Sequence, residues 1–252
     1  MCILLVAHQH HPVYDLVVAA NRDEFHARPS APAGFWEDHP NLLAGRDLEA
    51  GGTWLGVNRT GRFSAVTNLR GGVARDPASS RGHLVRDFLL DSAPASLDFL
   101  SALASQRTRY AGCNLLLAEG EAMHWWSPGG ERALSPGIYG VSNTPLDEDW
   151  PKVGRLKRSF LPLGDARGET LVSALLELLR DREVSSPDGR AQNFHPARLE
   201  ETIFVHTPSY GTRCSSIVLR DRRAGRLIFM ERRYDANAEV AGETWQEFEL
   251  LS

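Results

Sequence analysis

The chain has 252 residues and a formal net charge of -4, and 42% of its residues are hydrophobic while 24% are charged. These values are typical of a globular protein with one large domain or two small ones. The slightly acidic balance argues against a nucleic-acid partner, which requires a basic surface. No apolar run approaches the ~20 residues that a membrane-spanning helix needs, so we expect no membrane span.

The three cysteines, Cys2, Cys113 and Cys214, lie far apart, and none belongs to a CxxC pair. This spacing predicts neither a disulfide framework nor a zinc site. The first apolar run is short, follows no basic residues and ends in HQHHP, which makes it a poor signal peptide. We therefore expect a cytoplasmic protein with reduced thiols, and the sequence indicates no metal and no cofactor.

Short apolar runs alternate with polar turns in the first part of the chain. Cys2–Ala7 and Leu16–Ala20 are apolar runs on either side of an HHP turn, and this pattern predicts a β-hairpin. The polar, proline-rich residues 21–40 predict a loop. Two more strands are predicted around a turn, over Trp54–Val57 and Arg62–Thr67.

Helical patterns dominate the middle of the chain, after a polar loop at residues 69–80. Ser80 can cap a helix that runs to Asp91, and leucines at helical spacing predict two more helices, over Ala95–Ser105 and Glu169–Arg182. The other predicted elements of this region are a hairpin over Asn114–Ala118 and Met123–Trp126, a strand over Ile138–Ser142 and a helix that begins near Pro151.

Strands return at the end of the chain, after a polar loop over Val184–Pro196. They are predicted over Thr202–His206, Ser215–Arg220, Arg226–Arg233 and Thr244–Leu250. An order of strands, helices and strands is typical of the α+β class, in which sheets pack together with helices outside. We see no repeat or linker, so we expect a single domain over residues 1–252.

Cys2 directly follows the initiator methionine, at the start of a predicted strand. Methionine aminopeptidase usually removes Met before a small residue such as cysteine. Cys2 would then carry both a thiol and a free α-amine, which together form a nucleophile with its own base. The alternative is that Cys2 is a small apolar residue at the start of a buried strand.

Polar residues follow several predicted strands. Asn21, Arg22, Asp23 and Glu24 come after the second strand, and the hairpin would bring them beside the N-terminus. Such a cluster is either a charged group at the mouth of a core or a solvated strand end.

Asn68 and Asn143 each end a predicted strand, and Arg213 precedes another. An asparagine at a strand end is commonly a turn former. Asn21, Asn68 and Asn143 together also suggest a polar rim at one end of neighbouring strands. His8, His10 and His11 cluster in the first turn, either as an exposed turn or as ligands of a metal or haem.

The chain resembles the NRDE family, also called the transport-and-Golgi-organisation family. The resemblance rests on MCILLVA, AANRDEF, GGTWLGVNRTGRF, TNLR, GVSNTPLD and YGTRCSS, which run from residue 2 to residue 216. This family is similar to the N-terminal nucleophile (Ntn) hydrolases, particularly the cholylglycine hydrolase and penicillin V acylase group. The resemblance implies a four-layer αββα sandwich.

The resemblance also implies roles for particular residues. It gives Cys2 as the nucleophile, Asp23 as the carboxylate near it, and Asn143 and Asn68 as groups that stabilise an oxyanion. Asn21, Arg22 and Arg213 are the corresponding candidates for substrate binding.

One departure concerns the substrate-side cation. The hydrolases have an arginine three residues before the aspartate, where this chain has Ala20. Arg22 is adjacent to Asp23 and in a strand would point to the other face. Arg213 is an alternative source of this charge.

Two functions follow from these observations. The first is a cysteine Ntn hydrolase that cleaves a non-peptide linear amide, so its partner is a small-molecule substrate. The second is a binding or transfer protein for haem or for lipid and acyl-CoA, functions to which eukaryotic members of the family have been linked. A structural protein that binds other proteins is a third alternative.

Overall fold

The computed structural model describes residues 2–70, 80–106, 109–146, 148, 150–184 and 201–251. The chain forms two compact units. The first unit comprises residues 1–28 and 136–247, and the second comprises residues 29–135 and 248–252. The predicted loops at 69–80 and 184–196 lie largely outside the described residues.

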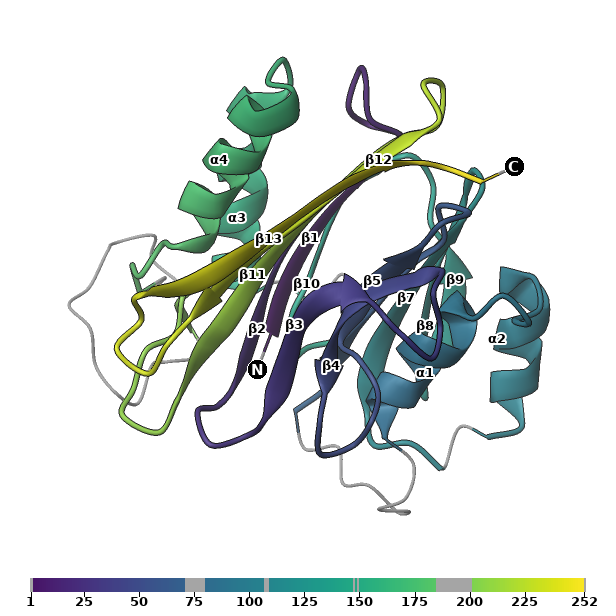
Figure 1. The fold of residues 1–252 in the computed structure, drawn as a ribbon, viewed down its shortest axis with the longest axis horizontal. Helices are drawn as coiled ribbons and strands as arrows, with labels where there is room; N and C mark the ends of the chain where they lie inside the picture. Colours follow the sequence, from purple (N-terminus) through teal and green to yellow (C-terminus); the bar gives the residue numbers. More distant parts are fainter. Residues whose placement is uncertain are drawn as a thin grey trace. The chain divides into compact units, whose positions relative to one another are not determined.

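The first unit is built on a six-stranded sheet in the order β10-β1-β2-β11-β12-β13 (Figure 1). β2 lies inside this sheet and pairs antiparallel with β1 on one side and with β11 on the other. The strands are β1 (Cys2–His8), β2 (Leu16–Phe25), β10 (Gly137–Val141), β11 (Tyr210–Asp221), β12 (Arg226–Tyr234) and β13 (Val240–Glu249), whose last two residues belong to the second unit.

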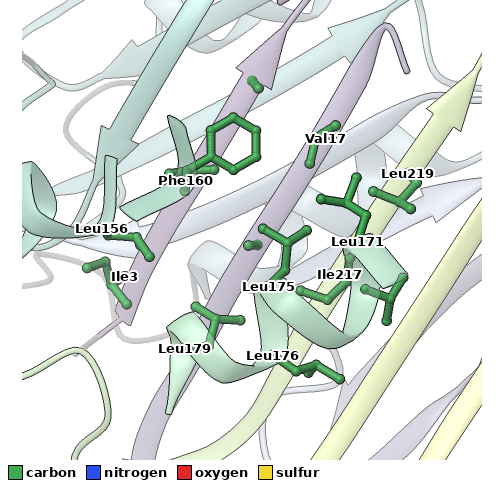
Figure 2. Close-up of a cluster of buried hydrophobic side chains, with 14 of the residues drawn as sticks. Ile3, Val17, Leu156, Phe160, Leu171, Leu175, Leu176, Leu179, Ile217 and Leu219 are labelled. Carbon is green, nitrogen blue, oxygen red and sulfur yellow. The ribbon is translucent and has the colours of Figure 1, made fainter. Parts of the chain in front are cut away.

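Two helices, α3 (Pro151–Phe160) and α4 (Gly168–Leu179), cover one face of this sheet. The short 3-10 helix η1 (Leu161–Leu163) connects them. Figure 2 shows the contact, in which Leu171, Leu175 and Leu179 of α4 pack on strand residues such as Val17 and Ile217. We call this surface the helix face.

Alternate residues of β1 divide between the two faces. Ile3 and Leu5 belong to the cluster under the helices. Since successive side chains of a strand point to opposite faces, Cys2 and Leu4 lie on the other face, which we call the Cys2 face. Leu4 is buried there, so the sheet buries apolar side chains on both faces.

The second unit has a seven-stranded sheet in the order β3-β4-β5-β6-β7-β8-β9. Helices α1 (Arg81–Leu89) and α2 (Ser96–Ala104) pack on one of its faces, over a cluster that includes Leu84, Phe88 and Trp126. The strands are β3 (Ser30–Phe35), β4 (Leu42–Asp47), β5 (Leu55–Asn58), β6 (Phe63–Asn68), β7 (Cys113–Glu119), β8 (Ala122–Ser127) and β9 (Gly130–Ala133).

The structure confirms the α+β class, the N-terminal hairpin and the four predicted helices. Ser80 is the N-cap of α1, and its side chain accepts a hydrogen bond from the backbone N–H of Gly82. A serine at this position satisfies one of the N–H groups that the first helical turn leaves without a partner. The single-domain organisation stays a prediction.

The prediction of a loop over residues 21–40 is wrong. β2 continues through the NRDE residues to Phe25, because β11 pairs with it as far as Tyr210 opposite Phe25. β3 also lies within this range, paired with β4. These ladders supply the backbone hydrogen bonds that the polar composition of the segment does not reveal.

Other strand predictions also need correction. The segment Thr202–His206 is not a strand, and in it His206 forms an isolated bridge to Gly211. Arg213 does not precede a strand but lies inside β11. The polar strand β9 was not predicted, since a short strand without apolar alternation gives no sequence signal.

Close backbone packing explains the second glycine of the GGTWLG motif, Gly52. The N–H of Thr53 donates to the carbonyl of Gly82 at 3.2 Å, which joins the start of this segment to the first turn of α1. A Cβ atom at Gly52 would lie 2.5 Å from the carbonyl carbon of Gly82 and 2.9 Å from the N of His83. These are backbone atoms and cannot rotate away, so only glycine allows this approach.

The first prediction follows from this contact. Gly52→Ala should lower the free energy of unfolding by roughly 1–3 kcal/mol, because overpacking forces the backbone apart. Gly34→Ala is the matched control, since nothing lies within 4 Å of the added atom. Urea unfolding of the two variants measures the difference, and equal stability would contradict the explanation.

Candidate active site

Four residues form one row across the first-unit sheet. Cys2 lies opposite Arg22, Arg22 lies opposite Cys214, and Cys214 lies opposite Arg233. Directly opposite residues of antiparallel strands share a face. Arg22 is therefore a buried cation on the Cys2 face, beside the candidate nucleophile.

The thiol of Cys2 is half-buried, and this burial raises its pKa above the usual range. The negative charge of Asp23 raises the pKa further. A hydrogen bond from the backbone N–H of Asp23 and the charge of Arg22 act in the opposite direction without overcoming the burial. The thiol is therefore protonated at neutral pH and needs a base before it can attack.

Asp23 is buried on the helix face, one residue after Arg22. Thr212 lies opposite it in β11 and donates a hydrogen bond from Oγ1 to the Asp23 carboxylate at 2.7 Å. Tyr210 donates from its hydroxyl to the Asp23 backbone carbonyl at 2.8 Å. Burial raises the pKa of Asp23, while the charges of Lys152 and Arg22 and the Thr212 hydrogen bond oppose that rise.

Asn143 lies beside the start of β1. Val141 of β10 pairs with Leu4, so the next residues run alongside the beginning of the strand. Ser142 donates from Oγ to the backbone carbonyl of Cys2 at 2.6 Å. Its Oγ is also 3.5 Å from Oδ1 of the buried Asn143. The structure thus brings Cys2, Asp23 and Asn143 together within one unit.

Asn21 anchors α4 to the sheet. Its amide nitrogen donates to the carbonyls of Leu179 at 2.8 Å and Ile203 at 3.0 Å, which uses both of its N–H groups. Its amide oxygen accepts a hydrogen bond from Ser215. Substrate binding by Asn21 stays a prediction.

Arg213 forms hydrogen bonds with the backbone at the end of β2. It lies at an irregularity in the pairing of β11 with β2, between Thr212 and Cys214. Its guanidinium donates to the carbonyls of Phe25 at 3.2 Å and His26 at 2.6 Å. A role in substrate binding stays a prediction here too.

Asn68 belongs to the second unit, where it is the last residue of β6 and pairs with Cys113. Its position at the end of a strand agrees with the sequence prediction. The expected role in stabilising an oxyanion stays a prediction.

Sequence reasoning missed Lys152 and Thr212 as neighbours of Asp23. Lys152 is fully buried in the first turn of α3. Lys152 and Lys157 are the only lysines of the chain, a usage that appears compositional when the sequence alone is read. Only its burial marks Lys152 as unusual, and burial depends on tertiary packing, which the sequence does not show.

The three histidines of the first turn have separate environments and do not form a common binding site. The Nδ1 of His11 accepts hydrogen bonds from the N–H groups of Val13 and Tyr14, and its Nε2 lies 3.1 Å from the carbonyl of Ala166. His8 is buried, while His10 is exposed. No group of three or more His, Cys, Asp or Glu residues is placed to hold a metal in the described part of the chain.

The fold resembles that of a solved amidase structure. A solved structure, the N-acylethanolamine-hydrolyzing acid amidase ortholog of Caenorhabditis elegans, matches 86% of this chain and 92% of its own with a TM-score of 0.52 at 13% identity. This likeness concerns the fold alone.

The family follows from the sequence comparisons. The family model for Transport and Golgi organisation 2 matches residues 1–236. The Transport and Golgi organization protein 2 homolog of Bos taurus is 34% identical over the whole of both chains, and that of Homo sapiens is 33% identical over 92% of each. The chain belongs to the Transport and Golgi organisation 2 family. Among the described residues, no helix has the length and apolar character to cross a membrane.

The second prediction is that Cys2 reacts first with iodoacetamide. Burial raises the pKa of Cys113 to about 12 and that of Cys214 well above its usual value, and both thiols are buried. Peptide mapping by mass spectrometry after brief labelling measures the order. Earlier labelling of Cys113 or Cys214 would mean that Cys2 is an inert strand residue.

The third prediction concerns whether Asp23 raises or lowers the reactivity of the Cys2 thiol. Asp23→Asn removes a negative charge that raises the Cys2 pKa, so the thiol should form thiolate at lower pH. Alkylation of Cys2 at neutral pH should become a few-fold faster, because a larger fraction of the thiol is then thiolate. Glu24→Gln removes the same charge from the next residue and should leave the rate unchanged. A slower reaction in Asp23→Asn would show that Asp23 does not act on the thiol through its charge.

Proposed function

We propose that the chain is a cysteine hydrolase of the Ntn type that cleaves a non-peptide linear amide, with Cys2 as the nucleophile. The observation that carries this proposal is the group around Cys2 in the first unit: Arg22 opposite it on the same face, Asp23 next to that arginine, and Asn143 beside the strand start. Acyl transfer needs a nucleophile, a base and donors for the oxyanion, and these residues supply the chemical types.

The reaction begins with a proton transfer. The thiol of Cys2 gives its proton to the α-amine that removal of Met1 exposes, and the sulfur attacks the amide carbon. The carboxylate of Asp23 orients this amine and stabilises the ammonium form, as the aspartate of a serine protease does for its histidine. A raised thiol pKa makes such a base necessary.

The oxyanion that forms is stabilised by the amide N–H groups of Asn143 and Asn68. Collapse of the intermediate breaks the C–N bond, and the leaving amine takes the proton from the ammonium. The acyl group then forms a thioester with Cys2. The α-amine next accepts a proton from water, and the hydroxide attacks the thioester. The C–S bond then breaks, the Cys2 thiolate takes the proton back from the ammonium, and the carboxylic acid is released. Arg22 positions a polar or anionic part of the substrate, since it lies on the same face as the thiol.

The proposal also covers the domain organisation and the cellular location. Residues 1–252 act as a single Ntn-hydrolase-like domain, a proposal supported by one family model that matches residues 1–236 and so includes residues of both units. The protein works in the cytoplasm, a location supported by its three free thiols, which an oxidising compartment would endanger.

The fourth prediction tests the oxyanion role of Asn143. On a panel of linear amides, Asn143→Ala should lower kcat by roughly 10²–10³-fold, the usual cost of removing one oxyanion donor. Asn58→Ala is a matched control, because Asn58 is a buried asparagine whose bonds hold its own turn and the carbonyl of Leu89. The control should lose stability without losing kcat.

Two further measurements decide the enzyme proposal. Intact mass spectrometry of the active protein should give a chain that begins at Cys2, and Cys2→Ala should abolish hydrolysis. Full activity with Met1 retained, or activity in Cys2→Ala, would exclude the mechanism. Binding of haem with a Soret shift that His10→Ala removes, in a protein without hydrolase activity, would favour the carrier function instead.

A further inference from the structure

Lys152 occupies a position that is physically unfavourable for a lysine. Its side chain is fully buried, and lysines are almost never fully buried unless they are paired. It also lies in the first turn of α3, where the positive end of the helix dipole disfavours a cation. A residue that tolerates both penalties requires a specific interaction partner.

The packing of α3 fixes where Lys152 lies. A Cβ atom at Gly140 of β10 would collide with Cγ1 of Val153, so the first turn of α3 rests directly on the sheet backbone. The Lys152 ammonium lies 4.8 Å from the centroid of the Trp150 ring, within the range of a cation–π contact. The charge is thus held against the helix face and cannot extend to water.

Asp23 lies on the same face of the sheet. Asn21, two residues earlier in β2, reaches the last carbonyl of α4, so Asp23 shares the face that the helices cover. Asp23 is also buried, and the charge of Lys152 stabilises its ionised form. The other groups that favour the ionised form of Asp23 are the N-terminal amine, whose effect is larger than that of Lys152, the hydroxyl of Thr212 and the charge of Arg22.

We propose that Lys152 is a positioning residue of the Cys2–Asp23 site, where it keeps the buried Asp23 carboxylate ionised and fixed behind the start of β1. The consequence for catalysis rests on the proposed function, in which Asp23 must be charged to hold the ammonium form of the Cys2 amine. The coupling between Lys152 and Asp23 does not need a substrate and can be measured on the thiol.

The direction in which loss of Lys152 changes the alkylation rate of Cys2 distinguishes a positioning role from a direct or a purely structural one. Removal of Lys152 favours protonation of Asp23, and a neutral Asp23 no longer raises the Cys2 pKa. Alkylation of Cys2 should therefore become faster. A lysine that acted directly on the thiol would have the opposite effect, because loss of a cation disfavours thiolate. A lysine with a purely structural role would leave the rate unchanged.

The experiment is the pH dependence of iodoacetamide labelling of Cys2 in the full chain. Lys152→Met should label a few-fold faster than the unmodified chain near neutral pH, because a larger fraction of the Cys2 thiol is then thiolate. Lys152→Arg should restore the original profile. Lys157→Met is the control, since Lys157 is the other lysine of α3 and is half-exposed. Unchanged or slower labelling in Lys152→Met would overturn the proposal.

The double variant Asp23→Asn/Lys152→Met tests the pairing even if Lys152→Met folds poorly. It removes both buried charges, so it should melt at a higher temperature than Lys152→Met, which leaves a buried carboxyl without its cation. It should also label no faster than Asp23→Asn alone. A double variant that is no more stable than Lys152→Met, or whose rate is the product of the two single effects, would overturn the coupling.

Hydrolysis is measured separately on the same variants. If the unmodified chain cleaves amides, Lys152→Met should move the acid limb of its pH profile upward, because a higher Asp23 pKa delays ionisation. If no amide is cleaved while the labelling shows the coupling, the proposed function fails and the assignment of Lys152 to the site stands.

Discussion

The pairing of β2 with β1 and β11 is the constraint on which the candidate site depends. It sets Cys2 opposite Arg22, and Thr212 opposite Asp23. A shift of one residue would exchange the two faces of β2. Arg22 would then lie under the helices and Asp23 on the Cys2 face. The site is therefore specified by strand register before any side chain makes a hydrogen bond.

The register also explains how a short polar run is accommodated in a buried strand. Asn21 and Asp23 point to the helix face, where an amide meets the end of α4 and a carboxylate meets Thr212 and the charge of Lys152. Arg22 points to the opposite face beside Cys2. Asn21 and Asp23 thus each have a hydrogen-bond partner on the helix face, as buried polar groups require.

Much of this fold could be predicted from the sequence, because apolar runs identified the hairpin, leucine spacing identified α2 and α4, and the start signals at Ser80 and Pro151 identified α1 and α3. The extent of β2 could not, because the residues Asn21 to Glu24 have the composition of a loop and become a strand only when β11 supplies its backbone hydrogen bonds. The candidate nucleophile and Asp23 were identified from strand ends and resemblance. Lys152 was missed because helical periodicity does not reveal that the first turn of α3 lies on the sheet at Gly140.

The electrostatics of Cys2 connect the structure to its proposed chemistry. Cysteine enzymes that rely on a preformed thiolate surround the sulfur with cations or a helix N-terminus, which lower its pKa. Here burial and the negative charge of Asp23 outweigh Arg22, and the thiol pKa is raised. A carboxylate near the thiol is therefore a disadvantage for a preformed thiolate, but an advantage if the thiol proton passes to a nearby amine. Because the main-chain nitrogen of Cys2 lies in the strand between the thiol face and the Asp23 face, the α-amine of a processed chain would stand between the two groups. The arrangement thus suits a thiol that is activated only when its own amine is free.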